Sequence, residues 1–194
     1  MRLPAAAALV ALALAAGCSS PATRTPTSTP KPGAGAPAPK PAVPPKLVVL
    51  LVIDQWPAWS FLAKRPQLRA GFDRLLREGE WHTGQHPSAA TITAPGHALL
   101  GTGEPSATSG ILSNEWYRRT SDRVLKSVED PDSAAGSSAR WLRAPGLGDA
   151  IAAAGTGAKA VSVSLKDRAA ILLLGHAGVP IWYDKKTVSW TSTA

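Results

Sequence analysis

The sequence predicts an α/β fold, layered, with a largely parallel sheet flanked by helices. One observation behind this is the continuous apolar run over residues 47–53, rich in valine, which is typical of a strand buried on both faces. Another is that strand-like and helix-like segments alternate along the rest of the chain, a pattern that favours helices packed on a mostly parallel sheet. The chain has 194 residues, enough for one domain of ordinary size.

The first segment has the features of a lipoprotein-type signal peptide, residues 1–18. Arg2 gives a positive start, residues 5–16 are apolar but too few to span a bilayer comfortably, and Leu14-Ala15-Ala16-Gly17-Cys18 resembles a bacterial lipobox. We therefore expect a lipid anchor on Cys18 and a location in the bacterial cell envelope, facing the periplasm. An ordinary signal peptide, cleaved nearby, is the alternative.

A linker follows over residues 19–46, and its Pro, Ala and Thr composition cannot bury a core. The folded domain is therefore expected over residues 47–194. Cys18 is the single cysteine of the chain, which excludes an intrachain disulfide and a site of several thiolates.

The net charge of +8 does not indicate a nucleic-acid partner. Five of the 21 basic residues precede Leu47 and all 13 acidic residues follow it, so 16 basic residues face 13 acidic ones and the domain is near +3. A nucleic-acid surface would need a basic cluster interleaved with aromatic residues, and the sequence contains none.

Three segments are predicted to be helical. Residues 72–76 have helical apolar spacing with Gly79 as a stop, residues 94–100 end at Gly101 and Gly103, and residues 147–154 are closed by Gly155.

Two further segments are predicted to be extended. Residues 158–165 alternate as a strand, and residues 181–183 and 187–190 form a hairpin around 184–186. No closing helix follows the hairpin, so we expect the fold to be incomplete at its C-terminus.

Two polar residues carry the first indication of chemistry. Asp54 closes the apolar run 47–53, where open α/β sheets place residues of their sites. Thr93 precedes Ala94-Pro95-Gly96 and is predicted to be a helix N-cap, with Pro95 in the first turn. A helix start presents unpaired N–H groups, an arrangement suited to a phosphate, so the pair suggests a metal-activated threonine nucleophile.

Four pieces in order carry a resemblance to a known family: Asp54, Thr93, the stretch 110–117 and the stretch 165–172. Together they resemble the alkaline phosphatase superfamily, and among its members the bacterial enzymes with a threonine nucleophile, close to the nucleotide pyrophosphatase/phosphodiesterases. The resemblance implies an alkaline-phosphatase-like fold for residues 47–194, of which this chain would be the N-terminal part.

The resemblance also implies roles for individual residues. Thr93 matches the nucleophile, Asp54 a zinc ligand, and Asn114 a residue that hydrogen-bonds a phosphoryl oxygen. Lys166 and Arg168 match the pair that holds the remaining phosphoryl oxygens, and two cations suit a dianionic monoester better than a diester. Thr93 in place of a modified Cys or Ser, and His97 in place of an Arg, argue against a sulfatase.

The metal site implied by the resemblance contains two zinc ions, with Asp54 and Thr93 among the ligands. The family's later Asp-x-x-x-His and Asp-His elements are missing from the sequence. We assign none of the four histidines to zinc, and we expect His97 to be structural. Two oxygen ligands cannot hold two zinc ions, so we expect little or no phosphatase activity from these residues alone.

The prediction is therefore a zinc-dependent phosphate monoester hydrolase that acts through a phospho-threonine, with a phosphate ester as substrate. Two alternatives stay open: a phosphodiesterase or nucleotide pyrophosphatase, and a non-catalytic envelope lipoprotein that is a remnant of such an enzyme. The sequence leaves open whether the chain is a fragment or a degenerate copy.

Overall fold

The computed structural model describes residues 45–193, and the chain divides into two units after Leu50. The predicted signal peptide with Cys18, and nearly all of the predicted linker, lie outside the described residues. Residues 45–50 contain neither helix nor strand. In the second unit the helices and strands are α1 (Ala58–Lys64), η1 (Arg65–Gln67), α2 (Gly71–Glu78), α3 (Thr93–Thr102), α4 (Ser106–Ser109), β1 (Glu115–Arg118), η2 (Arg119–Ser121), β2 (Arg123–Lys126), α5 (Leu147–Ala153), β3 (Val161–Ser164), α6 (Asp167–Leu174), β4 (Val179–Asp184) and β5 (Ser189–Ser192).

The main sheet has three strands in the order β3-β4-β5. β3 and β4 are parallel and are joined by α6, whereas β4 and β5 form an antiparallel hairpin. The predicted strand 158–165 and the predicted hairpin are thereby confirmed, and so is the α/β class. Among the described strands, parallel pairing is limited to β3 and β4, and β1 and β2 make a separate antiparallel hairpin.

The predicted strand over residues 47–53 is wrong in this structure. The segment has no regular structure, and most of its apolar side chains, including Leu47, Leu51 and Ile53, are exposed. A strand is stable only when its backbone groups pair with a neighbour, and no described strand pairs with this segment. The composition identified an apolar segment correctly, but no pairing partner is present in the described part of the chain.

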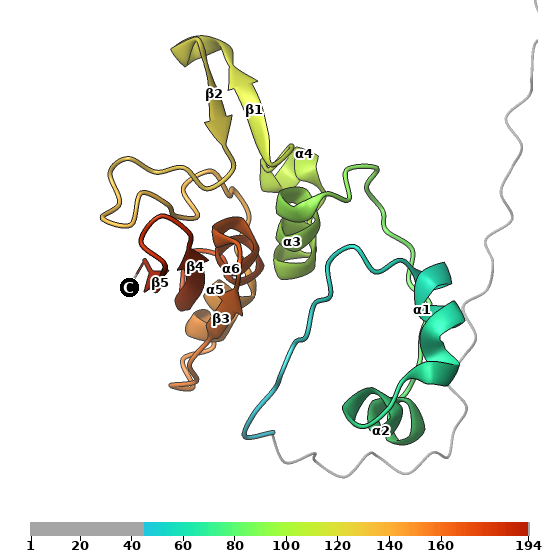
Figure 1. The fold of residues 1–194 in the computed structure, drawn as a ribbon. Coiled ribbons are helices and arrows are strands. Elements are labelled where there is room, and N and C mark those ends of the chain that lie inside the picture. The colour runs from blue at the N-terminus through green and yellow to red at the C-terminus, as the bar shows by residue number, and fades with distance from the viewer. Residues whose placement is uncertain (1–44, 194) are drawn as a thin grey trace, which may run out of the picture. The chain divides into compact units, whose positions relative to one another are not determined.

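The core lies between the sheet and two stacked helices. α6 packs against β3 and β4 and also against α3 (Figure 1). Its Ala170, Ile171 and Leu172 are buried together with Ala94 and Ala98 of α3. The small α3 residues allow a close approach, because a Cβ atom on Gly101 would lie 2.7 Å from the carbonyl oxygen of Leu172. This contact fixes the start of α3 relative to the start of α6.

The three predicted helices are present. Gly79 is the C-cap residue of α2 and Gly103, with a positive φ of 73°, is that of α3, whereas α5 ends one residue before the predicted position. α6, α1, α4 and the β1–β2 hairpin were not predicted. Of the helices that the structure describes, none has the length and apolar character needed to cross a membrane.

Candidate active site

Asp54, Thr93 and Lys166 form a hydrogen-bonded cluster, although they are distant in the sequence. The Thr93 hydroxyl donates to Asp54 Oδ2 over 3.1 Å. Lys166 Nζ lies 3.3 Å from the same carboxylate oxygen and 3.4 Å from Thr93 Oγ1. The Thr93 oxygen therefore has an acceptor for its proton on one side and a cation on the other, an arrangement that stabilises an alkoxide.

Thr93 occupies the first position of α3 rather than the predicted N-cap. Ile92 is the N-cap residue and has extended backbone angles, and no side chain of its own caps the helix. Thr93 is buried, and its hydroxyl bonds to Asp54 instead of to the helix backbone. The predicted N-cap position was wrong by one residue. The Thr93 hydroxyl bonds to Asp54, which comes from a distant segment, instead of capping the helix. Pro95 lies in the first turn, as predicted.

Asn114 caps α3 from outside the helix. The Ala94 backbone N–H donates to Asn114 Oδ1 over 2.9 Å. A backbone N–H can only donate, so the amide oxygen must face the helix and the NH₂ group must point elsewhere. Asn114 thus satisfies one orphan donor of α3, and the helix does not use its two amide donors.

Lys166 and Arg168 lie at the beginning of α6. Lys166 is the N-cap residue, with extended backbone angles, and Arg168 lies in the first turn. The Arg168 N–H donates to Asp167 Oδ1 over 2.7 Å, and the guanidinium lies 3.7 Å from the same oxygen. Within the described residues, the buried Nε of Arg168 has no hydrogen-bond partner. The helix start therefore presents two cations, one of which retains a free donor.

The charges and hydrogen bonds of the cluster change the pKa of Asp54. Burial raises the pKa of this carboxyl, but the hydrogen bonds from Lys166 and Thr93 and the charge of Lys166 outweigh burial, so the pKa lies below its ordinary value. Asp54 is therefore ionised at neutral pH, as an oxygen ligand or a proton acceptor needs to be.

The described residues fit part of a metal site. Asp54 Oδ2 and Thr93 Oγ1 are oxygen donors 3.1 Å apart, close enough to bind one ion together. Within residues 45–193, however, no three His, Cys, Asp or Glu side chains gather into a group that could hold a metal. Two oxygens are fewer than the roughly four ligands that zinc takes, so this part of the chain does not complete a zinc site.

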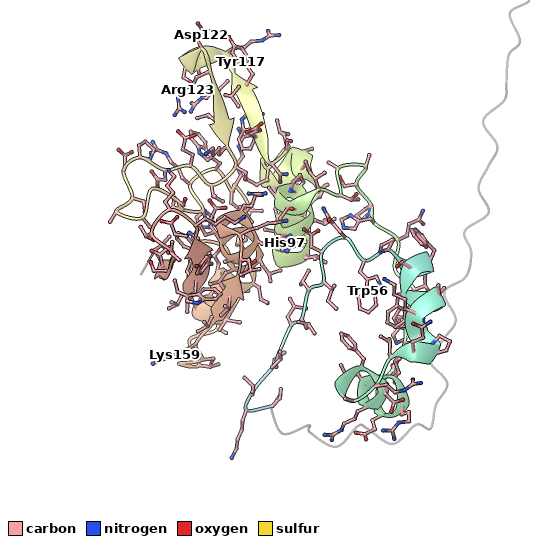
Figure 2. The ribbon with its side chains drawn as sticks, viewed as in Figure 1. Trp56, His97, Tyr117, Asp122, Arg123 and Lys159 are labelled. Carbon is pink, nitrogen blue, oxygen red and sulfur yellow. The ribbon has the colours of Figure 1, made fainter. Side chains whose placement is uncertain are left out.

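The histidines have other roles where the structure describes their contacts. His97 is a buried residue of α3 (Figure 2). Its Nδ1 donates to the carbonyl of Thr93 over 2.8 Å. His176 bonds to Asp149 and to the carbonyl of Leu142. The structural role predicted for His97 is confirmed by this contact.

Sequence reasoning missed a polar hollow beside the cluster. It is lined by residues 113–115, 126–128 and 167–168, and so includes both Asn114 and Arg168. Residues 126–128 come from the end of β2 and the turn after it, a hairpin that was not predicted. No motif singled them out, because only the pairing of β1 with β2 brings them beside Asn114.

Comparison with known families identifies one model, described as type I phosphodiesterase / nucleotide pyrophosphatase, that matches residues 48–181. The alkaline phosphatase PhoD of Zymomonas mobilis is 36% identical over 146 residues, which are 71% of this chain and 25% of PhoD. This chain therefore spans about a quarter of the length of that relative.

Solved structures of the alkaline phosphatase PafA share the fold. The wild-type PafA structure has a TM-score of 0.70 and 34% sequence identity, covering 78% of this chain and 32% of PafA. A PafA variant in which one threonine, one asparagine, one lysine and one arginine are replaced has a TM-score of 0.67 and 31% identity, with the same coverage.

Proposed function

This chain belongs to the type I phosphodiesterase / nucleotide pyrophosphatase family, within the alkaline phosphatase superfamily, and on that premise we propose its function. It supplies the nucleophile and the phosphate-binding residues of a zinc-dependent phosphate monoester hydrolase that acts through a phospho-threonine. The observation that carries the proposal is the Asp54–Thr93–Lys166 cluster, which surrounds one hydroxyl with a carboxylate and an ammonium group.

Thr93 is the proposed nucleophile. Its hydroxyl proton is directed at Asp54, and its oxygen lies beside the Lys166 ammonium group. Attack on phosphorus would form the Thr93 O–P bond and release the alcohol. Water would then cleave the phospho-threonine, releasing phosphate and restoring the hydroxyl.

Asn114, Lys166 and Arg168 are proposed to hold the phosphoryl group. The NH₂ group of Asn114 comes from a loop residue that caps α3, and the ammonium group of Lys166 and the free Nε of Arg168 come from the start of α6. Donors fixed in advance stabilise the charge on the transferring group at little reorganisation cost. The four residue types replaced together in the PafA variant are those of Thr93, Asn114, Lys166 and Arg168, which supports these roles.

Asp54 and Thr93 are the residues that would hold zinc. A bound zinc ion lowers the pKa of a coordinated hydroxyl and so makes the alkoxide available near neutral pH. Among the described residues, Asp54 orients the Thr93 hydroxyl and the two side chains provide the oxygen donors. Lys166 neutralises negative charge on the Thr93 oxygen.

A monoester is preferred because of the two cations at the start of α6. A monoester dianion carries one more charge than a diester, and Lys166 with Arg168 matches the dianion. The second candidate is a phosphodiesterase or nucleotide pyrophosphatase, favoured by the description of the matching family. The third is a non-catalytic envelope lipoprotein that binds anions.

The location is also a proposal. A lipid on Cys18, with residues 19–46 as a tether, would hold the domain at a bacterial envelope membrane, facing the periplasm. The lipobox-like sequence supports this. Mass spectrometry of the mature N-terminus tests it, since a diacylglycerol-modified Cys18 is expected and an unmodified N-terminus elsewhere would contradict it.

The function is tested by hydrolysis of 4-nitrophenyl phosphate and of bis(4-nitrophenyl) phosphate, with and without added zinc. Where the remaining zinc ligands are supplied, the proposal predicts zinc-dependent hydrolysis of the monoester, faster than that of the diester, and its loss in Thr93→Ala, whereas these residues alone should show little or no turnover. A faster reaction with the diester would favour the second candidate. Metal-independent phosphate binding without turnover would favour the third.

A further inference from the structure

The hollow beside Asn114 and Arg168 is of a size that suits a small ligand. Its volume is about 480 Å³, and ligand pockets usually have roughly 300–1,000 Å³. Two of its lining residues, Asn114 and Arg168, are also the residues proposed to hold the phosphoryl group. A phosphate ester held by them would therefore have this hollow next to its phosphorus.

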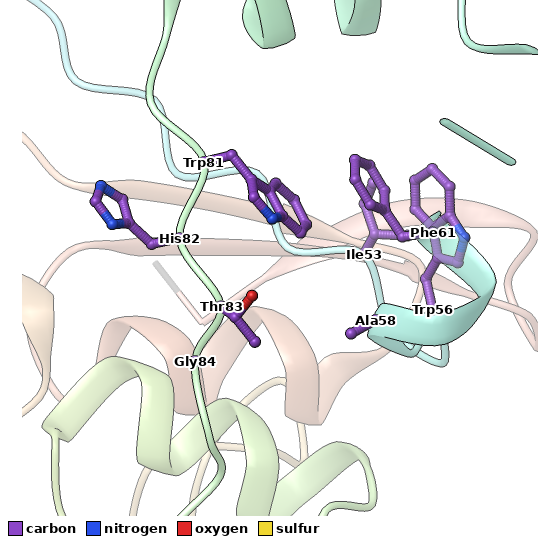
Figure 3. A pocket seen from close by; sticks show the side chains of 8 residues that line it. All are labelled: Ile53, Trp56, Ala58, Phe61, Trp81, His82, Thr83 and Gly84. Atoms are coloured by element: carbon purple, nitrogen blue, oxygen red, sulfur yellow. The ribbon is translucent and has the colours of Figure 1, made fainter. Parts of the chain in front are cut away.

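The walls of the hollow are polar. Val128 is the one apolar side chain among residues 113–115, 126–128 and 167–168, and it is itself buried. A second pocket in the described chain is quite different, because Trp56, Phe61 and Trp81 line it (Figure 3). None of Thr93, Asn114, Lys166 or Arg168 lines that aromatic pocket. The polar hollow offers a ligand hydrogen bonds, whereas it has no ring on which an aryl group could stack.

Two residues that line the hollow each have one buried polar atom without a hydrogen-bond partner in the described chain. These atoms are the Oγ of Ser127 and the Nε of Arg168. An unsatisfied buried polar group costs about 1–3 kcal/mol, so a ligand that bonds to it gains affinity. The Ser127 hydroxyl can donate or accept, so a ligand hydroxyl can satisfy it, whereas the Arg168 Nε donor is the one proposed to hold the phosphoryl group.

The charges around the hollow balance. Glu115 and Lys126 are directly opposite each other on β1 and β2, and neither side chain forms a salt bridge or a side-chain hydrogen bond with a described residue. Asp167 and Arg168 add one further charge of each sign. A charged ligand group would be attracted by one pair member and repelled by the other, whereas neutral hydroxyls can bond to both acids and bases.

We propose that this hollow binds the alcohol half of the phosphate ester and selects polyhydroxylated alcohols, such as those of glycerol or sugar phosphates, over aryl alcohols. Glu115, Lys126 and Ser127 are the residues that determine this preference. The inference rests on the proposed function, because Asn114 and Arg168 must hold the phosphoryl group for the alcohol to reach the hollow.

Calorimetric titration of the full chain tests the proposal with three probes: inorganic phosphate, glycerol 3-phosphate and phenyl phosphate. Two additional hydrogen bonds of ordinary strength predict about tenfold tighter binding of glycerol 3-phosphate than of phenyl phosphate. Lys126→Met and Ser127→Ala should each remove most of that preference and leave the affinity for inorganic phosphate unchanged. Lys126 is exposed, so Lys126→Met retains the fold even if Ser127→Ala does not.

The matched control is Lys159→Met, which changes the same charge at a residue that does not line the hollow. It should leave all three affinities unchanged. Equal affinities for the two esters, with phosphate still bound, would overturn the inference and leave the proposed function standing. An equal loss for all three probes in Lys126→Met would also overturn it, since Lys126 would then bind phosphate. Failure of inorganic phosphate to bind would overturn the phosphate-holding roles and the inference together.

Discussion

Asn114 caps α3 through its amide oxygen and is proposed to bind phosphate through its NH₂ group, and a substitution can separate the two roles. Asn114→Asp keeps an oxygen that accepts from the Ala94 N–H, but replaces the NH₂ donors with a negative charge. We expect the variant to be as stable as the wild type, because a carboxylate is favourable at a helix N-terminus. Phosphate binding should be lost, which calorimetry would detect.

Asn114→Ala is the matched variant, since it removes the cap and the donors together. Loss of a cap costs about 1 kcal/mol, so this variant should be less stable than the wild type by that amount in urea unfolding. If Asn114→Asp bound phosphate as the wild type does, the proposed donor role of Asn114 would be wrong.

Lys166 contributes most to the lowering of the Asp54 pKa. Burial alone raises the pKa of Asp54, and the Lys166 hydrogen bond is the largest influence in the opposite direction. Lys166→Met should therefore raise the pKa of Asp54, observable by NMR titration of the carboxyl carbon. Lys159→Met serves as the control and should leave that pKa unchanged. An unchanged pKa in Lys166→Met would show that the two side chains do not interact in solution.

For the candidate site, the sequence predicted which residues take part better than it predicted which of them contact one another. It predicted Asp54, Thr93, Asn114, Lys166 and Arg168 as site residues, and the structure places the first two and Lys166 within hydrogen-bonding distance. It could not predict that Asn114 caps α3, because a capping residue that comes from a distant segment cannot be recognised in the sequence around the helix start.

The packing of α3 on α6 positions both helix starts, and Gly101 makes this packing possible. An alanine there would bring its Cβ atom within 2.7 Å of the Leu172 carbonyl oxygen, a backbone atom that cannot move freely. Overpacking costs typically 1–3 kcal/mol, so Gly101→Ala should lower the free energy of unfolding by about 2 kcal/mol.

Gly71→Ala is the control for this prediction, because nothing lies within 4 Å of the added Cβ atom at the first residue of α2. It should leave stability unchanged or raise it slightly. Equal effects of the two substitutions in urea unfolding would contradict the close approach of α3 and α6.

Asp149 links the start of α5 to the loop after α6. It accepts from the Gly146 N–H over 2.6 Å and from the His176 N–H over 3.1 Å. Burial raises its pKa, but these bonds and the His176 side chain outweigh burial, so the pKa lies below its ordinary value. The stabilisation is therefore fully present above the unfolded-state pKa, near 3.9, and is lost as the pH falls through the lower folded-state pKa.

Asp149→Asn should consequently be less stable than the wild type by about 1–2 kcal/mol at pH 7. The difference between the two proteins should shrink below about pH 4. Urea unfolding at several pH values measures it. A difference that stays constant down to pH 2 would mean that the charge of Asp149 contributes nothing.

Local signals predicted the individual elements well wherever a glycine or an alternating pattern marked them, as for α3, α5, β3 and the β4–β5 hairpin. They failed for residues 47–53, because apolar composition does not reveal whether a pairing partner exists. The β1–β2 hairpin was missed because η2 and Asp122, which adopts a positive φ, make its turn without a glycine (Figure 2).

Taken as one molecule, the described chain brings the starts of α3 and α6 within hydrogen-bonding distance, through Thr93 and Lys166, with Asn114 capping α3 beside them. The family resemblance predicted this grouping, whereas composition and spacing alone predicted only the α/β class and a polar helix start. The polar hollow could not be predicted at all, since it depends on how β2 pairs with β1 beside Asn114.

The central claim is that Thr93, Asn114, Lys166 and Arg168 form one phosphate-binding site. The most direct test is an NMR titration of the full chain with inorganic phosphate, followed at each backbone amide. We predict that the amides of Ala94, Asn114, Lys166 and Arg168 shift together with one dissociation constant, and that Arg168→Met abolishes the shifts. Shifts confined to the exposed arginines of the β1–β2 hairpin, or no shifts, would contradict the account.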